Sequence, residues 1–230
     1  MSYFDVLCAG FLAGGGMSRS ASLAINLILV NMRVNDLTPK YDFQIVELAQ
    51  QVENEYIGSP CGQLDQIMIY YAKDGMGTHF NPKTKKITYV PLGKTPEAAK
   101  LRIVGLDTGT TRHGLESSTY SIRSRECREL VALLQDAGYK IESLADLDDA
   151  AYAQARKQFG KSHPNLCRRM KYIFEAQKRF YQMMDAWKAG DVATVGRIFR
   201  QDGIGLRDDY EISGGVGARS LVVINCGSLR

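Results

Sequence analysis

The chain has 230 residues, of which 45% are hydrophobic and 23% are charged, a balance typical of a globular protein with one large domain or two lobes. Its net charge of +4 is too mild to indicate a nucleic-acid partner. No apolar run approaches the roughly 20 residues of a membrane span, and the N-terminus lacks the basic start of a secretion signal. We therefore expect a cytoplasmic protein that binds neither nucleic acid nor membrane.

The cysteines, histidines and clustered basic residues all have plain interpretations. The five cysteines are far apart and form no Cys-x-x-Cys pair, which predicts reduced thiols, and the isolated histidines argue against a zinc site. The densest basic cluster falls at helical spacing and predicts a solvated helix face. Its members are Arg168, Arg169, Lys171, Lys178 and Arg179.

The first part of the chain mixes predicted strands and helices. Residues 3–10 predict a buried strand that leads into a glycine-rich loop, and a helix is expected over 21–30. The apolar face of that helix consists of Ala24, Leu27 and Ile28. A second helix over 42–56 carries one apolar stripe. The stripe consists of Phe43, Val46, Ala49, Val52 and Tyr56.

The rest of the chain changes from strands to helices. After an apolar segment at 67–72, strands are expected at 78–81, 86–91 and 101–107. Long helices are then expected at 118–138 and 166–187, and a short one at 193–200. We expect residues 94–100 to form a hinge between an α/β half and a mostly helical half.

The glycine-rich loop is the first stretch that indicates chemistry. Three consecutive glycines, Gly14, Gly15 and Gly16, let the backbone approach a ligand closely, and the helix that follows points its free N–H groups at the loop. Phosphate binds well at such a helix end, and serine hydroxyls add ligands for phosphate or magnesium. The loop follows neither the Walker nor the dinucleotide spacing, and a flexible turn capped by Ser18 or Ser20 is the alternative.

The second informative stretch runs from Glu53 to Gln66. It holds a carboxylate at the end of a helix, a glycine-broken turn, and another carboxylate, Asp65, twelve residues on. If the turn folds over the glycine loop, Glu53 can reach a magnesium ion on nucleotide phosphates and Asp65 can face the group to be phosphorylated. The alternative is two solvated surface acids.

These two stretches, with Asp107-Thr108, Arg112-His113, the run from Ser117 to Cys127, and Leu206 to Glu211, resemble the galactokinase family of the GHMP kinase superfamily. The motifs follow the family's order over roughly residues 3–213. The resemblance implies an α+β, two-lobed fold with the active site between the lobes. An N-terminal ATP-binding lobe with sheet and helices would span 1–97, and a mostly helical C-terminal lobe with a small sheet would span 98–230.

By the same resemblance, the protein would transfer the γ-phosphate of ATP to the anomeric hydroxyl of galactose, with Mg²⁺ as cofactor. Asp65 matches the catalytic base and also contacts the sugar, as does Tyr120. Ser20 and Glu53 match the magnesium ligands. The phosphate-binding residues are Gly14, Gly15, Gly16, Ser18, Arg19 and Ser20.

Departures from the family pattern leave alternatives open. Arg19 replaces the middle one of three serines, and residues 202–205 replace a Ser-His pair, as in galacturonokinase-like relatives. The acceptor is therefore galactose, galacturonate or another related sugar. The family's usual first segment and its C-terminal glycine-rich motif are not matched, so both lobes are expected to be incomplete, with edges exposed for self-association or a complementing chain. A catalytically inactive sugar or nucleotide sensor is the alternative from another class.

Overall fold

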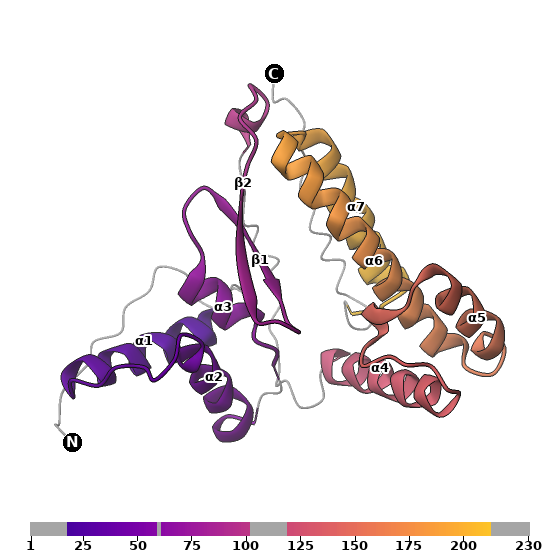
Figure 1. Ribbon diagram of the computed structural model, residues 1–230, viewed down its shortest axis with the longest axis horizontal. Helices are drawn as coiled ribbons and strands as arrows, with labels where there is room; N and C mark the ends of the chain where they lie inside the picture. The colour runs from indigo at the N-terminus through magenta and orange to yellow at the C-terminus, as the bar shows by residue number, and fades with distance from the viewer. Residues whose placement is uncertain (1–17, 59–60, 102–118, 213–230) are drawn as a thin grey trace. The chain divides into compact units, whose positions relative to one another are not determined.

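The computed structural model describes residues 18–58, 61–101 and 119–212, which fall in two compact units that divide between Val90 and Pro91. Figure 1 shows the elements of both units. Up to the division, the elements are α1 (Arg19–Val34), α2 (Gln44–Gln51), the π-helical turn η1 (Val52–Tyr56), α3 (Leu64–Tyr71), β1 (Met76–Asn81) and β2 (Lys86–Pro91). The strands β1 and β2 pair as a two-stranded sheet.

Buried apolar side chains hold the three helices of the first unit together. Ile25 of α1 packs with Ile45 of α2 in one cluster, and Val46 of α2 packs with Ile67 of α3 in a second. Phe43 stacks on Tyr71 and on Phe80 of β1, with ring centroids 5.7 and 5.6 Å apart. The hairpin is thus fixed to the helices that carry the predicted site.

The buried face of α2 and η1 differs from the predicted apolar stripe. Val52 is 37% exposed and Tyr56 is 89% exposed, whereas Glu53 is only 5% exposed. The buried positions Val46, Ala49 and Glu53 keep the three-four spacing of a helix, so the face that points inward ends in a carboxylate. A search for apolar residues necessarily passes over an acid at that position.

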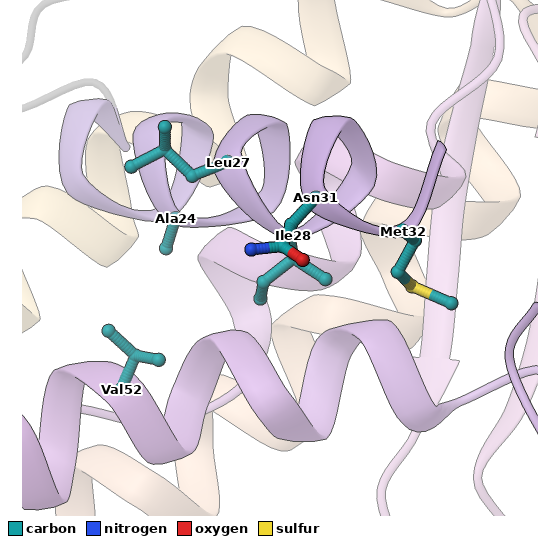
Figure 2. A pocket seen from close by; sticks show the side chains of 6 residues that line it. All are labelled: Ala24, Leu27, Ile28, Asn31, Met32 and Val52. Atoms are coloured by element: carbon teal, nitrogen blue, oxygen red, sulfur yellow. The ribbon is translucent and has the colours of Figure 1, made fainter. Parts of the chain in front are cut away.

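Val52 instead faces an apolar groove of about 370 Å³ beside α1 (Figure 2). The groove is lined by Ala24, Leu27, Ile28, Asn31, Met32 and Val52. None of these described lining residues has an ionisable side chain, so they offer no group for acid–base or metal chemistry. The predicted apolar face of α1 is also partly wrong. Leu27 is 43% exposed, and Ala21 and Ile25 are buried in its place.

After β2, all regular elements among the described residues of the second unit are helices. Its elements are η2 (Ala98–Lys100), α4 (Thr119–Asp136), η3 (Leu144–Asp146), α5 (Asp149–Phe159), α6 (Pro164–Ala189) and α7 (Val192–Asp208). Leu130 and Leu134 of α4 pack with Met170 and Phe174 of α6 in its main core. Within this unit, α6 and α7 lie side by side (Figure 1).

Local signals set the helix ends in this unit. Pro164 occupies the first turn of α6, and Gly190 ends that helix in the left-handed conformation with φ of 71°. Asp148 and Asp191 cap α5 and α7 by accepting hydrogen bonds from the backbone N–H groups of Ala151 and Thr194. Helix α5 was not predicted, and α7 is longer than predicted.

The predicted α+β class is confirmed, with a helix-rich chain and one small sheet. The strands expected at 3–10 and 101–107 fall largely or wholly outside the described residues. Among the residues that the structure describes, no helix is long and apolar enough to cross a membrane.

Candidate active site

The Glu53 carboxylate connects three elements of the first unit. Its Oε2 atom accepts a hydrogen bond from Ser20 Oγ at 3.2 Å, and its Oε1 atom accepts one from Gln66 Nε2 at 3.1 Å. Ser20 lies in the first turn of α1, Glu53 in η1 and Gln66 in the first turns of α3. Two residues predicted as ligands of one ion, 33 positions apart in the chain, are therefore in direct contact.

This carboxylate is buried without a cation beside it. Within the described part of the chain, no lysine or arginine forms an ion pair with Glu53, and its hydrogen bonds come from a hydroxyl and an amide. A buried charge is costly unless it is paired or bound to a metal. The position therefore suits a divalent cation.

The donor set is compatible with magnesium. Mg²⁺ prefers oxygen ligands and usually takes one or two from a protein, with the remainder from water and substrate phosphates. Ser20 Oγ and a Glu53 oxygen are such a pair. The described residues include no cluster of three or more His, Cys, Asp or Glu side chains of the kind that holds a metal without a nucleotide.

The N-terminus of α1 provides the backbone donors of the predicted phosphate site. Ser18 precedes the helix with φ of 57°, a left-handed conformation that is uncommon outside glycine, and its carbonyl accepts from Ser22 N at 2.9 Å. Arg19 begins the helix and is exposed. The three glycines of the loop, residues 14–16, lie outside the described residues.

The two predicted sugar-contacting residues lie in different units. Asp65 is exposed in the first turn of α3, next to Gln66 in sequence. A carboxylate there is accessible to a substrate hydroxyl. Tyr120 lies in α4, and its side chain is outside the described part of the structure.

Side-chain amides fold the turn between Glu53 and Asp65. Asn54 Oδ1 accepts from the backbone N–H of Cys61 at 2.8 Å, and Gln50 Nε2 donates to the Cys61 carbonyl at 3.0 Å. Burial raises the pKa of the Cys61 thiol, which favours its neutral form. The turn is thus fixed by neutral hydrogen bonds, and the π-helical geometry of η1 is a feature that recurs at functional sites.

Gln66 is the residue of the site that sequence reasoning missed. Its side chain is fully buried, and its Nε2 atom also lies 3.5 Å from Cys61 Sγ. Its Oε1 atom is buried and has no hydrogen-bond partner among the described residues, and an unsatisfied buried acceptor costs about 1–3 kcal/mol. The only signal in the sequence was its place in the same run as Glu53 and Asp65.

Comparison with known proteins first gives a class that the first unit resembles. Residues 9–73 match the family model described as the GHMP kinases N terminal domain, and this range includes α1, α2, η1 and α3. The matched range contains the contact between Ser20 and Glu53 and the start of α3 that carries Asp65.

The similar proteins are galactokinases. The galactokinase of Limosilactobacillus reuteri is 28% identical over 92% of this chain and 52% of its own length. That of Clostridium acetobutylicum is 30% identical over the same shares. The crystal structure of Lactococcus lactis galactokinase complexed with galactose matches with a TM-score of 0.73 and 25% identity, over 89% of this chain and 50% of that chain.

The predicted resemblance to galactokinases is confirmed by the similar proteins and the solved structure, and the family model agrees with the GHMP kinase superfamily. The chain is similar to them over most of its own length, and it spans about half the length of the curated relatives it matches.

Proposed function

We propose that this protein is an ATP-dependent sugar 1-kinase that transfers the γ-phosphate of Mg-ATP to the anomeric hydroxyl of galactose. The observation that carries the proposal is the buried Glu53 carboxylate, which contacts Ser20 and lies without a cation among the described residues. Similarity to galactokinases, one of them solved with galactose, supports the choice of substrate class.

The proposed mechanism divides the work among three places in the first unit. The N-terminus of α1 binds the phosphates through its backbone N–H groups, with Arg19 beside them. Ser20 and Glu53 would hold the magnesium ion, which supplies neutralisation of phosphate charge when bound. Asp65 orients the sugar hydroxyl and accepts its proton.

In the transfer itself, the anomeric oxygen forms a bond to the γ-phosphorus while the bond from that phosphorus to the β–γ bridging oxygen breaks. ADP leaves with the electron pair of the broken bond, and the hydroxyl proton moves to Asp65. The products are ADP and the sugar 1-phosphate.

One departure from the family pattern has a structural account. Asp202 lies inside α7, where its Oδ1 atom accepts from Arg179 Nη2 at 3.0 Å and its Oδ2 atom accepts from Tyr172 at 3.3 Å. The side chain is thus used in packing α7 against α6. This position gives no reason to prefer galacturonate over galactose as the acceptor. Galacturonokinase therefore remains the alternative function.

The test is a coupled assay of ADP release with Mg-ATP and galactose, galacturonate or arabinose, run beside Asp65→Ala. We expect turnover with galactose that the substitution abolishes. Turnover with galacturonate alone would change the acceptor. A folded chain that binds Mg-ADP and turns over none of the sugars would contradict the kinase and favour a sensor.

A further inference from the structure

The Gln66 amide has only one sensible orientation. The Glu53 oxygen that it faces is a hydrogen-bond acceptor, so the NH₂ end must point at Glu53 and the carbonyl end away from it. The reversed amide would place two acceptor oxygens against each other. Because the carboxylate fixes the other end of the amide, Gln66 Oε1 is left without a partner in the part of the chain that the structure describes.

A residue that served packing alone would not need this arrangement. Gln66 is 0% exposed and lies beside Ile67, which belongs to an apolar cluster, so an apolar side chain would satisfy the same position. The amide is instead joined to a carboxylate whose second oxygen contacts Ser20. This chain of contacts resembles the outer shell of a metal site, where neutral donors orient a ligating carboxylate.

We propose that Gln66 is a positioning residue for the divalent cation. Its NH₂ group holds the Glu53 carboxylate in the orientation that presents it beside Ser20. The proposal rests on the proposed function, because it assumes that Glu53 is a cation ligand.

The test measures cation affinity separately from nucleotide affinity. Mn²⁺ is titrated into the full chain saturated with ADP, and binding is followed by electron paramagnetic resonance of the free ion. Gln66→Met keeps the length of the side chain and removes both polar atoms. We expect it to weaken Mn²⁺ binding by about 10- to 100-fold, the range for lost outer-shell contacts, and to leave ADP affinity in EDTA unchanged.

Gln63→Met is the matched control. Gln63 lies at the start of the same helix, and its Nε2 atom donates to Gln50 Oε1 at 2.8 Å rather than to Glu53. We expect this variant to bind Mn²⁺ within about twofold of the wild type, because its loss does not reach the carboxylate. Equal weakening in both variants would indicate a general disturbance of the turn and overturn the proposal.

A measurement on the unaltered chain keeps the proposal testable if Gln66→Met does not fold. In the ¹⁵N spectrum of the ADP-saturated protein, adding Mg²⁺ should shift the side-chain NH₂ signals of Gln66 and leave those of Gln63 in place. Cation binding without such a shift overturns the proposal.

The two proposals fail in different ways. If the wild type binds Mn²⁺ with ADP and Gln66→Met binds it equally well, only the positioning role is overturned. If the wild type binds no Mn²⁺ in the presence of ADP, the cation site and the positioning role are both overturned.

Discussion

Two carboxylates of this protein contrast sharply, Glu53 in the first unit and Glu126 in the second. Glu126 Oε2 accepts from Arg169 Nε at 2.8 Å and from Arg123 Nη1 at 2.7 Å. Arg169 is only 2% exposed, and its other nitrogens donate to the Glu211 carboxylate at 2.6 Å and to the Asp209 carbonyl at 2.5 Å. The arginine thereby joins α4, α6 and the segment after α7.

Glu53 is the more buried carboxylate of the two, yet among the described residues it has only neutral partners. For Glu126, burial acts to raise the pKa, but hydrogen bonds from Arg169 and Arg123 outweigh it and hold the pKa below its ordinary value. The second unit thus uses its arginines to complete a fold. The first unit leaves an acid available for a charge that a ligand would bring.

Replacing each acid by its amide should separate these roles. Glu53→Gln should weaken Mn²⁺ binding and sugar-dependent turnover by at least about 100-fold, because a neutral amide is a poor ligand for a hard cation. Stability in urea should be unchanged or slightly higher, because a buried charge without a cation has been removed. Glu126→Gln should lower stability in urea and leave Mn²⁺ binding at the wild-type level.

The matched control for Glu53→Gln is Glu55→Gln, in the same π-helical turn. Glu55 is exposed and accepts a hydrogen bond from Gln51. We expect wild-type cation binding from it. A loss of stability in Glu53→Gln as large as in Glu126→Gln would contradict the contrast.

Removing the central arginine should have the largest effect on folding. Arg169→Met removes the most buried partner of Glu126 and Glu211, which keep only their pairs with Arg123 and, for Glu211, Arg168, and it should lower the free energy of unfolding by about 3 kcal/mol. Urea denaturation measures the change, and Mn²⁺ binding with ADP should stay at the wild-type level.

Arg168→Met is the control for this change, because Arg168 is 43% exposed and pairs only with Glu211 among the described acids. It should cost less than about 1 kcal/mol. Equal losses in the two variants would show that burial of Arg169 is not what makes the cluster stabilising.

The sequence predicted most helices and strands well, but it predicted the buried polar contacts poorly. Helices 118–138 and 166–187 and strands 78–81 and 86–91 were recovered within a few residues, because periodicity records which positions are apolar. Helix α5 was missed because most of its apolar residues are alanines, which give a weak periodic signal; Ala155 is buried in the main core, and Tyr152 and Phe159 pack against it.

Buried polar groups produce no such periodic pattern in the sequence. The basic cluster on α6 was predicted to be a solvated face, but Arg169 is almost fully buried and Arg179 is paired with Asp202, because acids distant in sequence reach them. Ser20 and Glu53 were assigned together only through the family resemblance, and Gln66 was not assigned. Periodicity cannot indicate which acid a buried cation or amide will meet.

Acid should weaken the second unit through its carboxylates. The pKa of Glu211 is lowered mainly by its hydrogen bond from Arg169, so the folded chain binds fewer protons there than the unfolded chain. Its contribution is complete above the ordinary pKa of 4.5 and is lost as pH falls below that value. The fall in unfolding temperature between pH 5 and about pH 3 should be shallower in Arg169→Met. An unchanged slope would contradict a stabilising role for the pair.

Ser20→Ala should have the smallest effect and tests whether the hydroxyl is a ligand or only a neighbour of Glu53. If Ser20 Oγ binds the cation, its loss should weaken Mn²⁺ binding with ADP by about fivefold, near 1 kcal/mol, because water can take the vacant position. Stability should change by less than about 0.5 kcal/mol, since Ser20 is exposed. Ser22→Ala, two positions further along the same helix, is the control and should bind Mn²⁺ as the wild type does. Wild-type affinity in Ser20→Ala would leave Glu53 as the only protein ligand of the pair.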